Sequence, residues 1–362
     1  MRHYKYLIIG GGMTADSAVH GIREMDANGQ IGIISKEQEN PYDRPPLTKG
    51  LWKDKTLESI WRHTENEHVS FHLGRGVEVI EPQQKRVVDD AKNTYTYDKL
   101  LLATGGRPRL LPFGEGQIIY YRTLDDYRRL RERADKNKRF VVIGSGFIGS
   151  EIAAALAMNQ KEVTMVFPGK SICERVFPQD LSQFLNNFYR EKGVELLPGE
   201  SATGLEARHA ELFLKTSSGR ELVTAAVVAG IGIQPNIELA QMAGLKTDNG
   251  IIVDEFLRTT HPDIYAAGDV AAFHSPALGQ YIRVEHEDNA NTMGKIAGHN
   301  MAGKPEPYRH LPFFYSDMFE LGYEAVGELD SRLETFADWK TPFREGVIYY
   351  LHAGRVRGVL LW

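Results

Sequence analysis

The chain has 362 residues, of which 42% are hydrophobic and 25% charged, and its formal net charge is −5. This composition is typical of a folded protein of about two or three domains and excludes a disordered or collagen-like chain. The charge gives no electrostatic footprint for nucleic acid, and no apolar run reaches the roughly 18 residues of a membrane helix. The first apolar run is also too short for a signal peptide. We therefore expect no nucleic-acid or membrane partner and a cytoplasmic location.

Cys173 is the one cysteine of the sequence. It can form no intrachain disulfide, no CxxC redox pair and no cysteine-based metal cluster. The 12 histidines show no HExxH or paired-ligand spacing, so no metal site is predicted. Glycine, in contrast, is enriched at 35 residues and gathers in a few places.

The first glycine-rich place follows directly on an apolar run at the N-terminus. Residues 6–9 predict a buried strand, and glycines follow at 10, 11 and 12. Residues 13–23 then predict a helix, because their apolar side chains recur at helical spacing, and residues 31–35 predict the next strand. Together these segments form a βαβ unit with GxGxxA at its turn.

The same pattern returns about one domain length later. Residues 140–143 predict a strand, glycines follow at 144, 146 and 149, and residues 152–157 predict a helix before a strand at 163–167. In such turns the glycines permit the sharp bend and let the backbone approach a pyrophosphate, which the helix N-terminus then attracts. One copy is a weak signal that a simple tight turn also explains. Two copies, each between a strand and a helix, predict two dinucleotide sites.

An acidic residue at the end of the second strand would hold a ribose hydroxyl in each site. After the first turn the candidate is Glu37, whose alternative is a solvated loop charge. After the second turn residues 167–170 contain no acid, and Glu174 stands farther along than this role requires. Lys170 and Arg175 could tolerate a 2′-phosphate or be surface charges. The choice between NADH and NADPH stays open.

The order of the remaining runs predicts how the domains are arranged. Residues 100–106 and 227–232 are buried strands ending in glycine that bracket the second βαβ unit, and residues 264–269 form another strand ending in Gly-Asp. We predict an α/β fold with two Rossmann-like dinucleotide-binding domains, the second inserted in the first, and a small C-terminal α+β domain. The expected bounds are 1–112 and 236–303 for the first domain, 113–235 for the second and 304–362 for the third.

Several motifs resemble one family. The segments PYDRPPLTK at 41–49, RVEHEDNA at 283–290 and PFFYSDMFELGYEAVG at 312–327 accompany ATGG, GIGIQPN and IYAAGDV. With the two glycine turns, they resemble the two-dinucleotide-domain flavoprotein reductases over nearly the whole chain. The branch is that of oxygenase-coupled ferredoxin reductases, rubredoxin reductases, monodehydroascorbate reductase and apoptosis-inducing factor. The resemblance implies FAD in the first domain and NADH or NADPH in the second.

The resemblance also implies site residues, carried over by position. FAD contacts are expected at Gly10, Gly11, Gly12, Met13, Thr14, Ala15, Arg44, Lys49, Val77, Thr104, Gly105, Arg122, Asp269, His286, Glu287 and Tyr315. The nicotinamide nucleotide is expected at Gly144, Gly146, Phe147, Ile148, Glu151, Gly232 and Glu285. Lys49 and Glu151 are the expected catalytic residues, as an ion pair bridging the two domains, with the lysine stabilising negative charge on reduced flavin.

This sequence also departs from the family. An acid is often found where Lys36 stands, and Glu287 replaces an aromatic residue seen near the flavin in some ferredoxin reductases. The chain ends at Trp362, where relatives usually continue, which leaves open whether the C-terminal domain is complete. The basic run at 127–139 is either a docking face for an acidic ferredoxin or a solvated helix surface, and the second alternative is favoured.

The expected function is that of an NAD(P)H-dependent FAD oxidoreductase. Hydride would pass from NAD(P)H to the flavin, and electrons would leave singly to a ferredoxin, a rubredoxin or a small quinone or radical acceptor. Disulfide-reductase and peroxide-type activities are excluded, because no cysteine stands in the PYDRPPLTK segment. The alternative is a redox-responsive protein like apoptosis-inducing factor, whose reduced charge-transfer complex controls association. The aromatic C-terminal region is a candidate homodimer interface.

Overall fold

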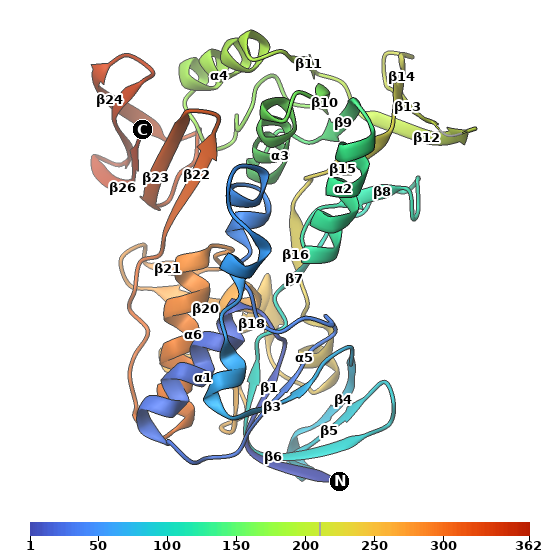
Figure 1. Ribbon diagram of the computed structural model, residues 1–362. Helices are drawn as coiled ribbons and strands as arrows, with labels where there is room; N and C mark the ends of the chain where they lie inside the picture. The colour runs from blue at the N-terminus through green and yellow to red at the C-terminus, as the bar shows by residue number, and fades with distance from the viewer. Residues whose placement is uncertain (210) are drawn as a thin grey trace. The chain divides into compact units, whose positions relative to one another are not determined.

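The computed structural model describes residues 1–209 and 211–362 (Figure 1). The chain forms two compact units. Unit 1 consists of Met1–Asp43, Leu57–Arg107 and Gln234–Phe313, and unit 2 of Arg44–Thr56, Pro108–Ile233 and Phe314–Trp362. The chain thus leaves unit 1 and returns to it, as the predicted insertion requires. The segment 44–56 and the C-terminal residues group with unit 2, which the sequence did not indicate.

Unit 1 is built on a seven-stranded mixed sheet, in the order β3-β2-β1-β6-β5-β4, with β19 also paired to β6. Its strands are β1 (Arg2–Ile9), β2 (Ile31–Ile34), β3 (Val69–His72), β4 (Val77–Glu81), β5 (Arg86–Asp89), β6 (Thr94–Leu102) and β19 (Ile264–Ala266). Strands β3, β2, β1, β6 and β19 are parallel, so their carboxyl ends lie at one edge. This is the predicted Rossmann-like sheet, and the antiparallel hairpin β4–β5 is an element that the sequence did not indicate.

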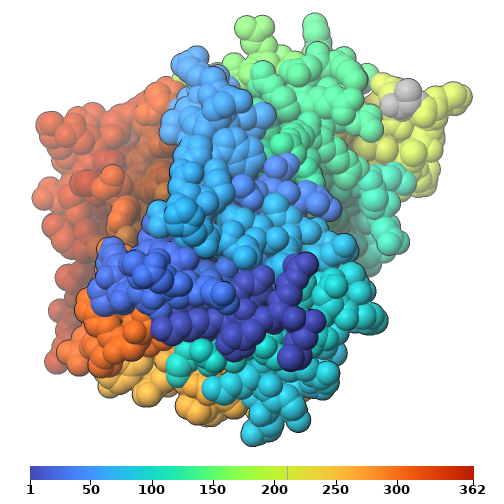
Figure 2. Space-filling model, turned by 60° about the horizontal axis from the view of Figure 1, so that its bottom comes forward, coloured from blue at the N-terminus to red at the C-terminus, as the bar shows by residue number. Residues whose placement is uncertain are grey.

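Helices α1 (Met13–Met25) and α6 (Glu287–Met301) pack directly against each other in unit 1. A Cβ built on Gly294 would lie 2.4 Å from the carbonyl oxygen of Thr14, and one on Gly298 would lie 2.3 Å from that of Ala18. The two backbones therefore touch, because glycine leaves no side chain between them. Figure 2 shows blue N-terminal residues beside the orange segment that includes α6 on one face of the molecule.

A smaller four-stranded sheet completes unit 1, in the order β17-β18-β20-β21. The remaining α-helix and strands described in this unit are α5 (Glu238–Met242), β17 (Thr247–Asp248), β18 (Gly250–Ile252), β20 (Ala271–Ser275) and β21 (Gln280–Ile282). Strands β7 (Gly106–Pro108) and β16 (Ile233–Pro235) stand where the chain passes between the units, and they pair with each other.

Unit 2 contains a five-stranded parallel sheet in the order β11-β10-β9-β15-β8. Its elements are β8 (Ile118–Tyr120), α2 (Leu124–Lys136), β9 (Arg139–Ile143), α3 (Phe147–Met158), β10 (Glu162–Phe167), α4 (Gln179–Glu191), β11 (Val194–Pro198) and β15 (Ala226–Ala229). The second predicted Rossmann-like domain is confirmed. Helix α3 begins at Phe147, earlier than the predicted 152 and directly after its N-cap Gly146, so that Gly149 lies within its first turn.

Two antiparallel sheets complete unit 2. The sequence did not indicate the first, which is formed by β12 (Ala202–Arg208), β13 (Glu211–Thr216) and β14 (Glu221–Thr224). The second is the predicted C-terminal sheet, in the order β22-β23-β26-β25-β24. Its strands are β22 (Phe313–Met318), β23 (Leu321–Gly327), β24 (Glu334–Thr341), β25 (Glu345–His352) and β26 (Arg355–Leu361).

Candidate dinucleotide sites and their family

The first glycine turn joins β1 to α1 in unit 1. Gly10 has φ of +112°, and a Cβ there would lie 2.1 Å from the carbonyl oxygen of Ala103, so only glycine fits. Gly12 is the N-cap of α1, and no side chain caps the helix there. The first backbone N–H groups of α1 are therefore left for a ligand, and a helix N-terminus favours an anionic one.

Other predicted residues gather at the same edge of this sheet, because each follows the carboxyl end of a parallel strand. Glu37 lies just beyond β2, and its Oε2 accepts a hydrogen bond of 2.5 Å from the Tyr42 hydroxyl. Asp269 follows β19, and the Gly268 before it packs against Thr14 of the glycine turn, where a Cβ would lie 2.2 Å from Oγ1. Both acidic residues thus follow strands whose carboxyl ends share an edge with the glycine turn, an arrangement that fits a dinucleotide.

Thr104 and Gly105 follow β6 at this edge as well. The Thr104 hydroxyl donates to the carbonyl oxygen of Asn236 at 3.0 Å, and the N–H of Asn236 donates to the carbonyl oxygen of Gly105, also at 3.0 Å. Val77 is the first residue of β4 and is buried.

The predicted segment at the start of α6 is also fixed in unit 1. Glu285 pairs with Arg283 at 2.6 Å, and Nη1 of Arg283 donates to the backbone carbonyl of Asp269 at 3.0 Å. His286 is the N-cap of α6, and Glu287 is its first residue. The Arg283 guanidinium thus contacts both the Glu285 carboxylate and the backbone carbonyl of Asp269, two residues that were predicted to bind different cofactors.

The second glycine turn joins β9 to α3 in unit 2. A Cβ on Gly144 would lie 2.4 Å from the carbonyl oxygen of Gly230, and a Cβ on Gly149 would lie 2.3 Å from that of Gly144. A Cβ on Gly146, in contrast, would meet no atom of the described residues within 4 Å apart from its own chain neighbours. Packing therefore requires glycine at 144 and 149. Gly146, the N-cap of α3, faces open space, and no side chain caps the helix there. A pyrophosphate fits such a turn.

The loop after β10 places Glu174, which the sequence set farther along than a ribose-binding acid, near the end of the strand. A Cβ on Gly169 would lie 2.2 Å from its Oε1. Its Oε2 accepts hydrogen bonds from the backbone N–H groups of Lys170 at 2.6 Å and Ser171 at 3.3 Å. Cys173, the residue before Glu174, has a left-handed backbone conformation with φ of 53°.

The predicted ion pair between Lys49 and Glu151 is confirmed, with 2.7 Å between Nζ and Oε1. Both residues belong to unit 2, so the pair lies within one unit instead of bridging two. The carboxylate is only 4% exposed, and two hydroxyls also donate to it, those of Thr48 at 2.5 Å and Ser316 at 2.5 Å. The Lys49 ammonium lies 5.4 Å from the ring centroid of Tyr315. The lysine is thus held by a fixed counter-charge and an aromatic ring.

The remaining predicted residues also lie in unit 2. Nη1 of Arg44 donates to the backbone carbonyl of Arg122 at 2.8 Å. Gly232 has φ of +91°, and its carbonyl accepts a hydrogen bond of 2.9 Å from the N–H of Arg109. Ile148 is 40% exposed at the start of α3, beside the turn.

Sequence reasoning missed the hydroxyls of Thr48 and Ser316, and it also missed a clamp around Arg62 in unit 1. Arg62 pairs with the buried Asp16 of α1 at 2.6 Å and with Asp43 of the PYDRPPLTK segment at 2.5 Å. No local pattern reveals these partners, because they come together only through the tertiary fold.

Two other features are structural. Burial raises the pKa of the Cys173 thiol to about 12, so it is not a reactive thiolate at neutral pH.

Helix α2 carries its predicted basic run, but Arg128, Arg131 and Lys136 pair with acids three or four residues away on the same helix. This pairing fits the solvated-surface alternative. Among the described residues no group of His, Cys, Asp and Glu is arranged to hold a metal ion.

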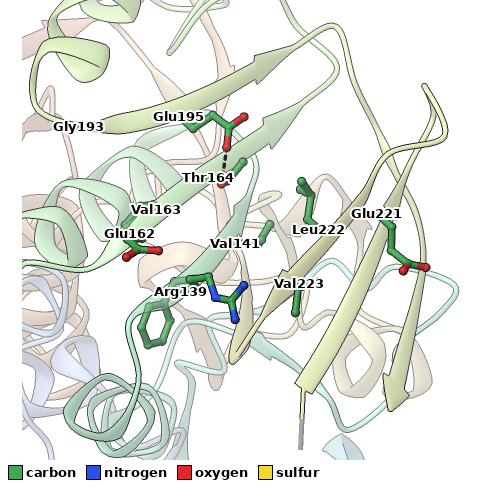
Figure 3. Close-up of a pocket in the computed structure, with 11 residues that line it drawn as sticks. Arg139, Val141, Glu162, Val163, Thr164, Gly193, Glu195, Glu221, Leu222 and Val223 are labelled. Carbon is green, nitrogen blue, oxygen red and sulfur yellow. Dashed lines mark hydrogen bonds between the residues drawn. The ribbon is translucent and has the colours of Figure 1, made fainter. Parts of the chain in front are cut away.

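A pocket of about 380 Å³ lies elsewhere in unit 2 (Figure 3). It is lined by Arg139 and Glu162, the first residues of β9 and β10, and by Thr164, whose hydroxyl donates to Glu195. The pocket therefore sits at the amino ends of the parallel strands, away from the carboxyl edge where the glycine turn lies. It is not part of the dinucleotide site.

Comparisons with known proteins agree with this geometry. Residues 4–294 match the family described as Pyridine nucleotide-disulphide oxidoreductase, and residues 297–342 match Apoptosis-inducing factor, mitochondrion-associated, C-term. Apoptosis-inducing factor 1, mitochondrial, of Dictyostelium discoideum is 35% identical over 100% of this chain and 76% of its own. The 3-phenylpropionate/cinnamic acid dioxygenase ferredoxin–NAD(+) reductase component of Photorhabdus laumondii is 33% identical over 91% of this chain and 86% of its own.

Among solved structures, the chain resembles that of a covalent putidaredoxin reductase–putidaredoxin complex, with a TM-score of 0.92 and 31% identity over 100% of this chain and 90% of that one. The predicted cofactors, FAD and NADH or NADPH, are those of the matched family. None of the described helices combines the length and hydropathy that crossing a bilayer requires. The chain belongs to the pyridine nucleotide-disulphide oxidoreductase family, in the branch that includes ferredoxin reductases and apoptosis-inducing factor.

Proposed function

We propose that the protein accepts hydride from NAD(P)H and passes electrons to a ferredoxin-type iron–sulfur carrier. The observation that carries this proposal is that the chain contains two glycine turns of the dinucleotide-binding type and the buried Lys49–Glu151 ion pair. FAD, when bound, supplies the chemistry of taking up a hydride and releasing electrons singly. The similarity to a ferredoxin–NAD(+) reductase component and to putidaredoxin reductase supports a carrier of this class.

The residues of each turn have distinct proposed tasks. The start of α1 and the carboxylates of Glu37 and Asp269 bind the FAD, while the start of α3 binds the pyrophosphate of the nicotinamide nucleotide. Lys49 presents a positive charge held in place by Glu151, so that negative charge on the flavin meets a preorganised partner. No protein group needs to take a proton from the hydride donor, so positioning is the main contribution of the chain.

The other proposed cofactor contacts follow the sequence resemblance. They are Gly10, Gly11, Met13, Ala15, Arg44, Val77, Thr104, Gly105, Arg122, His286, Glu287 and Tyr315 for FAD, and Phe147, Ile148, Gly232 and Glu285 for the nicotinamide nucleotide. Our prediction for the compartment is the cytoplasm, whereas the apoptosis-inducing factors similar to this chain have mitochondrial in their names.

An anaerobic titration tests the proposal. The purified protein should carry yellow flavin, NADH or NADPH should bleach it, and an added iron–sulfur ferredoxin should then reoxidise it rapidly. A colourless protein that takes up no FAD, or a reduced flavin that reacts with no iron–sulfur carrier, would contradict it.

A second function is favoured by a specific observation, the match of residues 297–342 to the C-terminal region of apoptosis-inducing factor. In that case reduction by NAD(P)H yields a long-lived charge-transfer complex that alters association with partners. The same titration separates the two. A stable long-wavelength absorption band with a change in oligomer size favours this second function, whereas rapid turnover with a carrier favours the first.

A further inference from the structure

We propose that Glu174 recognises the adenosine ribose of the nicotinamide nucleotide and excludes a 2′-phosphate, so that NADH and not NADPH is the hydride donor. The inference rests on the proposed function, in which unit 2 binds this nucleotide, and it names the substrate of that site. Four steps support it: the position of the carboxylate, its free oxygen, the rigidity of its loop and its charge.

The carboxylate lies where the sequence pattern calls for an acid. In a dinucleotide-binding βαβ unit, an acidic side chain at the end of the second strand binds the ribose hydroxyls. Here that strand is β10, which ends at Phe167, and the nearby position 169 is glycine. A Cβ built on Gly169 would lie 2.2 Å from Oε1 of Glu174. The Glu174 carboxylate therefore fills the space that a side chain at position 169 would occupy.

The two oxygens of this carboxylate have different surroundings. Oε2 accepts the backbone N–H groups of Lys170 and Ser171, which fixes the orientation of the group. Within residues 1–209 and 211–362, Oε1 accepts no hydrogen bond from the protein. One oxygen is thus anchored, and the other remains able to accept a bond from a ribose hydroxyl.

The loop that carries Glu174 is tied to the glycine turn and to α4. The N–H of Cys173 donates to the carbonyl oxygen of Ser145, which lies between the glycines at 144 and 146, at 2.8 Å. The side chain of Asn186 on α4 accepts from the N–H of Ile172 at 3.0 Å and donates to the carbonyl of Lys170 at 2.9 Å. These bonds hold the carboxylate at a set place relative to the pyrophosphate-binding turn.

Charge then separates the two nucleotides. A hydrogen bond between a ribose hydroxyl and a carboxylate is charge-assisted and strong. A 2′-phosphate at the same place would bring two negative groups together. Lys170 and Arg175 would attract a phosphate, but both are exposed, and the charges of exposed cations are screened by water and salt. The anchored carboxylate therefore has the larger effect.

Binding of two probes to the flavin-loaded protein tests the inference without any electron transfer. ADP-ribose and 2′-phospho-ADP-ribose differ only in the 2′-phosphate, and calorimetry gives the ratio of their affinities. The wild-type protein should bind ADP-ribose about tenfold tighter or more. Glu174→Gln should bring the two affinities within about threefold of each other, because the amide keeps the shape and loses the charge. Glu191→Gln, an exposed carboxylate at the end of α4, makes the same charge change and should leave the wild-type ratio intact.

A second variant leaves Glu174 in the chain. Gly169→Ala would place a Cβ against the tip of the Glu174 side chain, which can swing away, so the protein should fold and lose the preference as Glu174→Gln does. The inference is overturned if wild-type protein binds 2′-phospho-ADP-ribose as tightly as ADP-ribose, or if both variants keep the wild-type ratio. Either outcome leaves electron transfer to a carrier untouched, so it is distinct from failure of the proposed function.

Discussion

Lys49 and Glu151 form an ion pair of 2.7 Å although 102 residues separate them in the chain. Both side chains are largely shielded from water, at 13% and 4% exposed. Because a buried charge without a partner is costly, each residue depends on the other to remain charged in this place.

Replacing Glu151 should therefore weaken the contribution of Lys49 to flavin reduction. In Glu151→Gln the amide keeps the shape but removes the counter-charge, so the Lys49 ammonium is no longer held in position. We expect anaerobic reduction of the bound flavin by NAD(P)H to slow about tenfold or more. Stopped-flow absorbance measures this rate, and Glu191→Gln provides the same charge change on an exposed site. Equal rates for Glu151→Gln and wild type would remove the pair from the mechanism.

The hydroxyl of Ser316 should contribute to stability through the same carboxylate. Ser316→Ala deletes a donor to a buried charge and should lower the free energy of unfolding by about 1–3 kcal/mol. Ser182 is an informative comparison, because its buried hydroxyl has no hydrogen-bond partner in the described part of the chain. Ser182→Ala should therefore change this free energy by less than about 0.5 kcal/mol. Urea unfolding measures both, and equal losses would contradict the assignment.

The second glycine turn allows folding and binding to be separated. Gly146→Ala adds a methyl group that meets no described residue within 4 Å except its chain neighbours, so stability should be kept while NAD(P)H binding weakens about tenfold or more. Gly149→Ala puts a Cβ 2.3 Å from the carbonyl oxygen of Gly144, so it should lose about 1–3 kcal/mol of stability or more. Thermal unfolding and nucleotide titration of the two variants check the contrast. Unchanged nucleotide binding by folded Gly146→Ala would contradict it.

The stability of unit 1 should depend on pH through Asp26, which follows α1. A hydrogen bond from the Lys5 ammonium at 2.6 Å is the largest cause that lowers the pKa of this carboxyl to about 2. A carboxyl whose folded pKa is depressed stabilises the fold above its unfolded pKa near 3.9, and this contribution disappears as the pH falls through the folded value.

Asp26→Asn should therefore be less stable than wild type by about 1–2 kcal/mol at pH 7. The difference should shrink between about pH 4 and pH 2, where the wild-type carboxyl takes up its proton. Urea unfolding of the two proteins at several pH values follows this difference. A difference that grows on acidification would contradict the assignment.

The sequence predicted correctly those elements that depend on residues close together in the chain. The strands at 6–9 and 140–143, the glycine turns and the helix after each turn follow from residue spacing, because backbone conformation and packing across one turn involve near neighbours. The pair of Lys49 and Glu151 was predicted through family motifs and not from periodicity.

By itself, then, the sequence determined two Rossmann-like domains with glycine turns between strand and helix, since apolar runs and glycines specify these locally. Only the tertiary structure decided which groups surround the carboxylates of Glu151 and Glu174. Ser316 reaches Glu151 from 165 residues away, and Glu174 returns to Gly169 through a left-handed turn. Contacts of this kind depend on how distant segments pack and on single backbone dihedrals, neither of which leaves a periodic mark in the order of residues.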